Sequence, residues 1–365
     1  MFTPPCCPNP DCSAHTAPPP PAPPAPDGEG KGKRFFRRAG YYHPKCRALA
    51  VPRFKCLLCN RGFSRQTFRM DYCDNKPYLN PELFKNLASG MGLRQSARIM
   101  GLSRRCTELK ARKLSRHLGR LNRNLTGEFT DGSRFSLDEM VTFEGERGAR
   151  PVSVAVLIET NSMYVIASDV ATMRASGKMT NERREAIAQA EERYGPREDR
   201  SKNALSRTFR RFRALTKNMT TVHLTSDKKH EYSRLLREFF ADRAVHLQIS
   251  SKLKRDQNNP LKHINLTNAM ARDLCGRLRR ESWLVSKARR FLRLQLHVFA
   301  AYRNFIRRRV NRFAETPAKI LGFLSRTATF SDLLTWRQDW KLRSIHPMAR
   351  RSESVAQVRE AAAVK

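Results

Sequence analysis

The sequence predicts an α/β protein with a mixed sheet that follows two smaller N-terminal modules. Runs rich in β-branched and apolar residues predict five strands, at residues 134–143, 152–159, 162–170, 220–226 and 244–250. The first three follow one another directly, whereas a helix at about 229–241 separates the last two. Consecutive strands joined by short turns pair antiparallel, and strands joined through a helix pair parallel. The sheet is therefore predicted to be mixed rather than doubly wound.

The charge of the chain indicates its class of partner. Its 365 residues include 71 Lys and Arg against 33 Asp and Glu, which gives a formal net charge of +38. This excess is larger than solubility requires and is typical of proteins that neutralise phosphates, so the predicted partner is a nucleic acid. The helical module described below predicts that this nucleic acid is double-stranded DNA. No apolar run is long enough to span a membrane, and no secretory signal is recognisable, so no membrane partner is expected. The expected location is a bacterial cytoplasm, in association with the nucleoid.

The first module contains two closely spaced cysteine pairs, in "CPNPDC" and "CLLC". A structural zinc ion takes four thiolates in a tetrahedron, and two short-spaced pairs supply them without long-range strain. The predicted zinc ligands are Cys7, Cys12, Cys56 and Cys59. Cys6 can replace Cys7 in this set, His15 and His43 are further candidate ligands, and reduced cysteines without a metal are the alternative. Nine cysteines, an odd number, fit a reducing compartment better than a disulfide framework.

The second module contains "LRQSARIMGLSRRCTELKARKLSRHL", in which Gly101 is placed at a turn and Ser103 at a helix N-cap. This pattern predicts a helix-turn-helix that binds DNA, with an ordinary basic helical hairpin as the alternative. The predicted core positions are Leu93, Ala97, Met100, Leu102, Leu109 and Leu114. The side chains predicted to contact DNA are Arg94, Arg104, Arg105, Lys110, Arg112 and Lys113.

Two acidic residues stand at the ends of predicted strands in this basic chain. Asp138 lies in "SLDEMVTFEG", and Asp227 follows the apolar run in "TTVHLTSDKK". Carboxylates at neighbouring strand ends are the ligands that hold divalent metals for phosphoryl transfer. Asp138 and Asp227 are therefore predicted to bind magnesium and to be catalytic. The alternative is that each acid pairs with a nearby lysine.

The order of these motifs resembles that of bacterial insertion-sequence transposases, in particular those related to the insertion-sequence-one group. The resemblance rests on "RFKCLLCNRGFSRQTF", "RQSARIMGLS", "SLDEMVTFEG", "LTSDKK" and the closing "INLTNAMARDLCGRLRRESWLVSKARRFLRLQLHVFAAYRNFIRRR", and it covers about residues 6–313. It implies a zinc ribbon, a helix-turn-helix domain and a ribonuclease-H-like core of the DDE type. It also implies that the protein binds transposon ends as a homo-oligomer. With magnesium, it would cut those ends and join them to target DNA.

The third acid that this family carries is not fixed by the sequence. The position that aligns with it is Asn265, and Asn268 is also uncharged. A helical region is predicted from about 268 to 313, and if Asn265 or Thr267 caps it, Asp273 falls in the second turn. Asp273 is therefore the predicted third catalytic residue, although a core without a third acid remains an alternative. The other candidates are Glu281, Glu139 and Glu144.

Composition also predicts how the chain is divided. Residues 17–33 are rich in proline and then glycine, and they are predicted to form a solvated insertion in the first module. Residues 174–218 are basic and mostly helical, and they are predicted to form an insertion in the sheet domain. The predicted domains are 1–72, 78–126, 133–313 and a tail at 314–365.

Three functions are compatible with these features. The first is an active DNA transposase. The second is a catalytically degenerate relative that binds DNA as a repressor, and the third is a nuclease of the same fold that acts on structured DNA.

Overall fold

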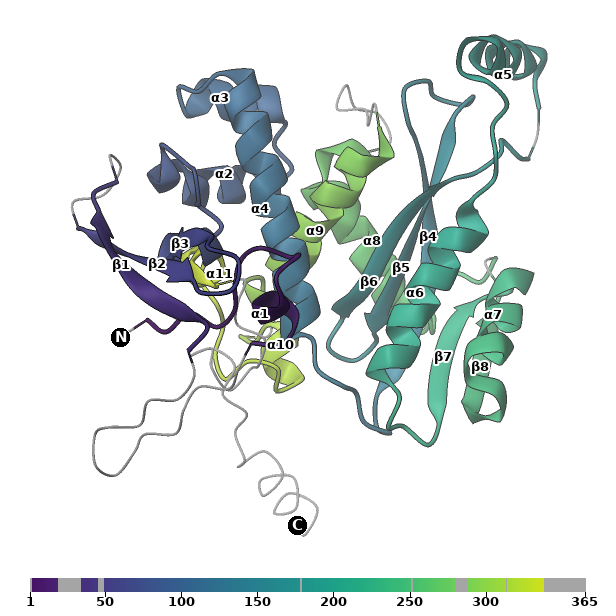
Figure 1. Cartoon of the computed structure of the whole chain (residues 1–365). Helices are drawn as coiled ribbons and strands as arrows, with labels where there is room; N and C mark the ends of the chain where they lie inside the picture. Colours follow the sequence, from purple (N-terminus) through teal and green to yellow (C-terminus); the bar gives the residue numbers. More distant parts are fainter. Residues whose placement is uncertain are drawn as a thin grey trace.

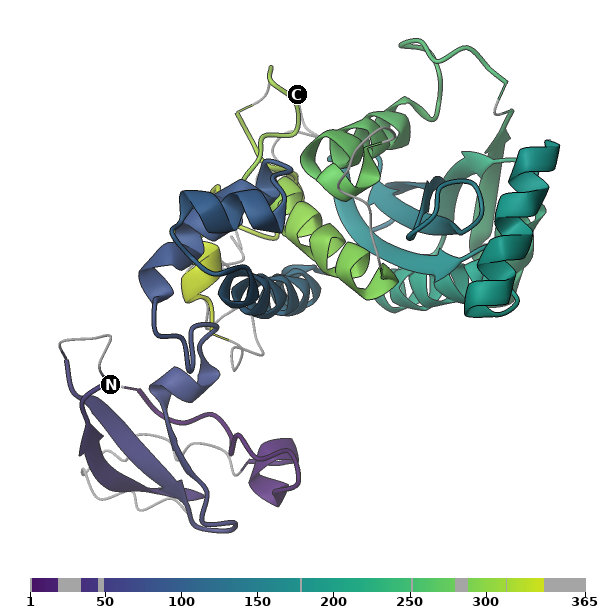
Figure 2. The same ribbon diagram turned by 90° about the horizontal axis from the view of Figure 1, so that it is seen from above.

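The computed structural model describes residues 2–18, 34–44, 49–177, 179–250, 252–279, 288–312 and 314–337. It consists of a small antiparallel sheet, a group of helices and a larger mixed sheet (Figure 1). Seen from above, the helices lie between the two sheets (Figure 2). Within the described ranges, no helix combines the length and the apolar composition that a membrane crossing requires.

The small sheet carries the cysteine module. Its strands are β1 (Phe36–Tyr42), β2 (Val51–Cys56) and β3 (Gly62–Ser64), which pair antiparallel in the order β1-β2-β3. The short helix α1 (Ser13–Thr16) and the 3₁₀ helix η1 (Arg65–Phe68) flank them. Phenylalanines from the strands and from η1 pack against one another and around the cysteines, with Phe63 and Phe68 edge-to-face. Because this core is small, a metal bound by the cysteines would contribute a large part of its stability.

Three helices follow the 3₁₀ helix η2 (Pro77–Leu79): α2 (Asn80–Ala88), α3 (Leu93–Ile99) and α4 (Arg104–Leu125). Gly101 has a φ of +60°, and the Ser103 hydroxyl accepts a hydrogen bond from the Cys106 N–H at 3.2 Å. The predicted turn and the predicted N-cap are therefore confirmed. The core prediction is wrong for Leu109, which is 52% exposed, whereas Leu114 is buried. Five residues separate the two leucines, and this spacing places them about 140° apart around a helix of 3.6 residues per turn.

The larger sheet has five strands in the order β6-β5-β4-β7-β8. They are β4 (Arg134–Phe143), β5 (Pro151–Glu159), β6 (Tyr164–Thr172), β7 (Val222–Asp227) and β8 (Ala244–Ile249). The neighbours β4, β5 and β6 pair antiparallel, whereas β7 pairs parallel with both β4 and β8. Helix α7 (His230–Phe240) joins β7 to β8. The predicted mixed α/β architecture is confirmed.

Helices cover both faces of this sheet. Ala155 and Leu157 of β5 pack in one apolar cluster with α6 (Ser201–Leu215), whereas Val156 packs in a second cluster with α8 (Lys262–Leu274). The region predicted to be a basic insertion contains α5 (Asn181–Tyr194) and α6. Helix α5 projects from the sheet, but α6 is part of the core and buries Phe209 and Phe212 (Figure 1). The apolar spacing at 205, 209 and 212 forms a buried stripe along an otherwise basic helix.

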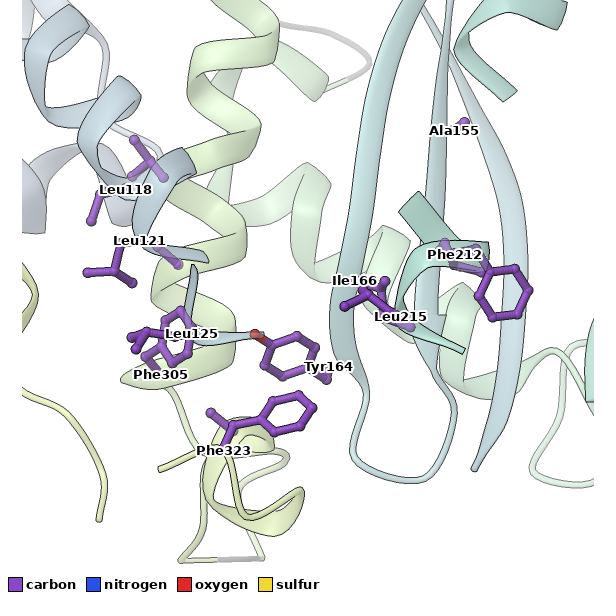
Figure 3. Close-up of a cluster of buried hydrophobic side chains, with 14 of the residues drawn as sticks. Leu118, Leu121, Leu125, Ala155, Tyr164, Ile166, Phe212, Leu215, Phe305 and Phe323 are labelled. Atoms are coloured by element: carbon purple, nitrogen blue, oxygen red, sulfur yellow. The ribbon is translucent and has the colours of Figure 1, made fainter. Parts of the chain in front are cut away.

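The helical group and the larger sheet share one apolar cluster. Leucines of α4, including Leu121 and Leu125, approach Phe305 of α9 (Arg289–Phe305) and Tyr164 at the start of β6 (Figure 3). Helices α4 and α9 lie so close that a Cβ atom on Gly119 would be 2.6 Å from the His297 ring. The two regions therefore do not have independent cores.

Buried polar contacts connect the same elements. The amide of Asn304 accepts from the Val165 N–H at 2.8 Å and donates to the Val165 carbonyl at 2.9 Å, as a neighbouring strand residue would. It also donates to Asn122 on α4 at 2.8 Å. The first part of the predicted tail, with α10 (Pro317–Ile320) and α11 (Phe330–Thr335), packs on this group and buries Trp336.

Candidate functional site

The four predicted zinc ligands converge in the small sheet. The Sγ atoms of Cys7, Cys12, Cys56 and Cys59 all lie within 4.8 Å of one another, with Cys7–Cys59 at 3.5 Å and Cys12–Cys56 at 3.8 Å. Bonds of about 2.3 Å to a tetrahedral zinc ion place sulfur atoms about 3.8 Å apart. The cluster could therefore hold a metal ion such as zinc. Cys6, the predicted alternative to Cys7, is not part of it.

Local backbone geometry sets the position of these thiols. Asn60, directly after Cys59, has a φ of 59° and donates its N–H to the Cys56 carbonyl at 3.1 Å, which closes the second cysteine turn. The Arg61 N–H lowers the pKa of the Cys59 thiol to about 7. Burial raises the pKa of Cys7. A bound cation would offset the cost of ionising such buried thiols.

The second site is the acidic cleft, a polar cavity of ≈ 330 Å³ beside the middle of β4 and the end of β7, lined also by α8. Asp227 ends β7 as predicted, whereas Asp138 lies in the middle of β4 and not at its end. Asp138 lies two residues beyond Ser136 on β4, and Asp227 lies two residues beyond Thr225 on β7. Ser136 and Thr225 are paired partners in the two parallel strands. Because side chains alternate along a strand, the two aspartates occupy matching positions on neighbouring strands and face the same side. The structure therefore brings together the two predicted magnesium ligands.

The adjacent Glu139 faces the opposite side of β4. Its carboxylate accepts hydrogen bonds from Lys229 Nζ at 2.5 Å, from the Tyr232 hydroxyl at 2.9 Å and from Ser153. The negative charge and the burial around Tyr232 raise the pKa of its phenol, with burial as the main cause. Strand alternation thus separates the two acids of the "DE" pair. Glu139 is neutralised by α7, and Asp138 remains available to the cleft.

Asn268 occupies the position opposite Asp138 on α8. Its side-chain amide donates to Asp138 Oδ2 at 2.8 Å, and its Oδ1 atom is buried without a hydrogen-bond partner among the described residues. Asn265 and two arginines, Arg255 and Arg272, also line the cleft. Two uncharged amides, Asn265 and Asn268, therefore lie on the side of the cleft where the resemblance predicts a third acid.

The structure does not bring the predicted third catalytic residue, Asp273, to the acidic cleft. Helix α8 begins at Lys262, earlier than predicted, so Thr267 lies inside the helix and Asp273 lies in its last turn. The Asp273 side chain is 73% exposed, lies 4.0 Å from Arg279 and does not line the cleft. Five residues separate it from Asn268, which corresponds to about 7.5 Å along the helix axis.

The other candidates for the third acid do not complete the site either. Glu144 is buried in an arginine cluster with Arg150, Arg197 and Arg289. Glu281 lies outside the described residues. Within the described ranges, the four cysteines form a group that could hold a metal ion, but no group of three carboxylates surrounds one point in the acidic cleft.

The environment of Asp138 raises the pKa of its carboxyl group to about 6. Burial is the main cause, and the charges of Asp227 and Glu139 add to it, whereas the Glu139 N–H and the Asn268 amide act in the opposite direction. Between about pH 4 and pH 6 the folded protein therefore holds a proton on Asp138 that the unfolded chain has lost. The stability contributed by this proton is fully present at pH 4 and is lost as the pH rises through 6.

We expect Asp138→Asn to raise the midpoint of thermal unfolding at pH 7.5, measured without magnesium on zinc-loaded protein. The rise should be roughly 2–6 °C, because the substitution removes an unfavourable buried charge. At pH 4 the aspartate is protonated, and the difference should disappear. Asp273→Asn, at an exposed position on the same cleft-lining helix, should have no effect at either pH. A lower midpoint for Asp138→Asn at pH 7.5 would show that the ionised carboxylate is stabilising.

The predicted DNA-contacting residues divide into two groups. Arg94, Arg104 and Arg105 are exposed at the start of α3 and α4. Lys113 is exposed, but its ammonium donates to the Tyr72 carbonyl at 2.6 Å.

Two predicted contacts are engaged inside the protein. Arg112 pairs with Glu108 and lies over the Phe291 ring. The prediction is wrong for Lys110, which is only 6% exposed. Its ammonium donates to both Asp74 carboxylate oxygens, at 2.5 and 2.7 Å, and to the Lys76 carbonyl. It fixes α4 to the segment before α2 and is not available to phosphates.

The fold and the two sites define a mixed α/β protein with a four-cysteine cluster and an acidic cleft. No protein-family model and no curated protein matches the chain.

Proposed function

We propose that this protein is a DNA transposase that binds transposon ends and catalyses magnesium-dependent strand cleavage and strand transfer. The observation that carries the proposal is the placement of Asp138 and Asp227 at matching positions of two parallel neighbouring strands, facing one cleft. Two such carboxylates in a strongly basic chain are suited to a phosphate substrate that a divalent cation accompanies.

The architecture supports the finer parts of this proposal. Three antiparallel strands followed by two parallel strands joined through a helix form the arrangement expected of a ribonuclease-H-like core. The four-cysteine cluster, with Cys56 and Cys59 where β2 leads into β3, is compatible with a zinc ribbon. Helices α3 and α4, with Gly101 between them, are compatible with a helix-turn-helix. This order corresponds to that of the transposases that the sequence resembles.

The residues present fit a divalent cation. Asp138 and Asp227 supply hard anionic oxygens, and the unpartnered amide oxygen of Asn268 is a third oxygen donor beside them. The two negative charges of Asp138 and Asp227 offset the charge of one divalent cation. Glu139 adds no further negative charge to this balance, because it is already paired with Lys229. Bound magnesium supplies Lewis-acid polarisation of the phosphoryl group and activates the attacking water or 3′-hydroxyl.

The chain itself positions the substrate. Arg255 and Arg272 line the cleft and would attract a phosphodiester toward the aspartates. The Asn268 amide and the Glu139 N–H hold the two oxygens of Asp138, each at 2.8 Å, so the carboxylate orientation is fixed before a substrate arrives. Such preorganisation lowers the cost of reaching the reactive geometry.

The direct test is the cleavage of duplex DNA that contains the ends of the element, identified as inverted repeats that flank the gene. We expect nicking at the ends with magnesium, and no nicking when magnesium is omitted from otherwise identical zinc-loaded protein. Joining of the cut strand to a second duplex would distinguish a transposase from a nuclease. End-specific binding without any cleavage, at every magnesium concentration, would contradict the proposal.

A second candidate function is a DNA-binding repressor derived from a transposase. The observation in its favour is that α8 presents the uncharged Asn265 and Asn268 to the cleft and no third carboxylate beside Asp138 and Asp227. This protein would bind the same ends without cutting them.

DNA binding provides a further prediction. Arg104→Ala and Arg105→Ala should each weaken binding to end-containing DNA by roughly 1–3 kcal/mol with a loss of sequence preference, if these exposed arginines contact bases. Lys110→Met is not expected to change the salt dependence of binding, because Lys110 is buried against Asp74. It should instead lower the thermal stability, because it leaves a buried carboxylate unpaired. Binding assays across a salt series would separate these effects, and unchanged binding by both arginine variants would contradict the assignment.

A further inference from the structure

A second cavity, of ≈ 390 Å³, lies along β6, and we call it the arginine cleft. In the five-stranded sheet β6 is an edge strand, and α4, α6 and α9 all contribute to the cleft. Four arginines line it: Arg123 of α4, Arg207 and Arg211 of α6, and Arg293 of α9. The one carboxylate in its lining is Asp169. Segments far apart in the sequence therefore bring together an excess of positive charge in a concave site.

A buried carboxylate and a main-chain carbonyl hold three of the four arginine side chains in place, those of Arg207, Arg211 and Arg293. Asp169, only 9% exposed, accepts from Arg207 and from Arg293 Nε at 3.0 Å. The Arg211 guanidinium donates to the Arg123 carbonyl at 3.0 Å. Arg207 and Arg293 still have side chains that are 44% and 45% exposed, so both can contact a ligand in the cleft. Guanidinium groups oriented in this way are suited to bind the oxygens of a phosphate.

We propose, on the basis of the DNA-binding function proposed above, that the arginine cleft binds the phosphate backbone of double-stranded DNA at a place separate from the acidic cleft. The two clefts share no lining residue, and β5 lies between β6 and β4 in the sheet. The site is formed partly by α4, whose exposed N-terminal arginines are the predicted DNA contacts. DNA bound by α4 could therefore continue along the edge of the sheet.

His297 also lines the cleft, and its imidazole adds no positive charge at neutral pH. Burial lowers its pKa to about 4, and the charges of Arg123 and Arg293 contribute. The imidazole is therefore neutral at pH 7, and the positive charge of the cleft comes from the guanidinium groups. Such a charge is the same at all pH values between about 6 and 9, so DNA binding here should depend on salt and not on pH.

The test uses the full chain without magnesium and a 30-base-pair duplex in fluorescence anisotropy. Arg123 and Arg211 are changed together to glutamine, because they line the cleft from two helices and the Asp169 pairs with Arg207 and Arg293 are left in place. The double variant should bind duplex DNA about tenfold more weakly, and the slope of log affinity against log salt should fall by about 2. The matched control is a double variant at two exposed arginines of α7, Arg234→Gln with Arg237→Gln. It should change the affinity by less than about threefold.

A second measurement does not depend on the folding of a variant. In the wild-type protein, phenylglyoxal labelling of Arg123 and Arg211, followed by mass spectrometry, should decrease when duplex DNA is added, while labelling of Arg237 should not. Equal losses in the cleft and control variants, or no protection of the two cleft arginines, would overturn the proposal. A larger loss for duplex RNA than for duplex DNA would overturn the choice of DNA. Both measurements report DNA binding in the absence of magnesium. Their outcome is therefore independent of whether the acidic cleft cleaves DNA.

Discussion

Replacing Asp138 or Asp227 by asparagine is expected to abolish magnesium-dependent cleavage of end-containing DNA. Each change replaces one of the two aspartate carboxylates that face the acidic cleft by a neutral amide, while the basic surface remains intact. Metal polarisation supplies several kcal/mol of transition-state stabilisation, and each 1.4 kcal/mol is tenfold in rate, so the rate should fall by about 10³-fold or more. DNA affinity should stay the same or increase slightly, because a negative charge is removed near a phosphate site.

Two further variants define the third position of this site. Asp273→Asn should cleave DNA at the wild-type rate, because its carboxylate is exposed and does not line the cleft. Asn268→Ala should lower the rate, because it removes the amide that orients Asp138. Single-turnover cleavage measured side by side on the four variants and the wild-type protein gives the ranking. Full activity in Asp138→Asn would overturn the catalytic interpretation and leave the repressor function standing.

Cys56→Ser is expected to release one metal ion per chain and to unfold the small sheet. Cys56 is fully buried and provides one of four thiols that lie within 4.8 Å of one another. Zinc binding by such sites contributes on the order of 10 kcal/mol to folding, which is more than a core of this size can replace. Metal analysis by mass spectrometry and limited proteolysis of the N-terminal region would measure the two effects.

The control for this prediction is Cys73→Ser. Cys73 is exposed and is not part of the cluster, so its variant should retain the metal and the protease resistance of the wild type. A full complement of metal in Cys56→Ser would rule out the four-cysteine assignment. Replacement of Cys6 should also leave the metal in place.

Much of the fold follows from local sequence patterns. The five strands are predicted within two residues of their observed bounds, because each is a short apolar run between clear turns. Ser103 and Gly101 are predictable because an N-cap and a left-handed turn each require particular residue types. Asp138 and Asp227 lie together because β4 and β7 pair parallel with Ser136 opposite Thr225, a register that the sequence alone does not contain.

The failures come from tertiary contacts that no local pattern contains. Asp273 was placed from an assumed helix start, and the observed start at Lys262 moves it to the far end of α8. Lys110 is basic on a basic helix, and only the fold shows that Asp74, 36 residues earlier, is its partner. The hydrogen bond from Asn268 to Asp138 has only a weak signal in the sequence. Asn268 is a polar residue one turn after Asn265, on a helix that follows the second aspartate.

The central claim is that Asp138 and Asp227 together bind a divalent cation. Titration of zinc-loaded protein with Mn²⁺ at pH 7.5, followed by electron paramagnetic resonance of the free ion, tests it without DNA. We expect about one Mn²⁺ per chain in the wild type and in Asp273→Asn, and a loss of this binding in both Asp138→Asn and Asp227→Asn. Unchanged Mn²⁺ binding in either of the last two variants would contradict the claim.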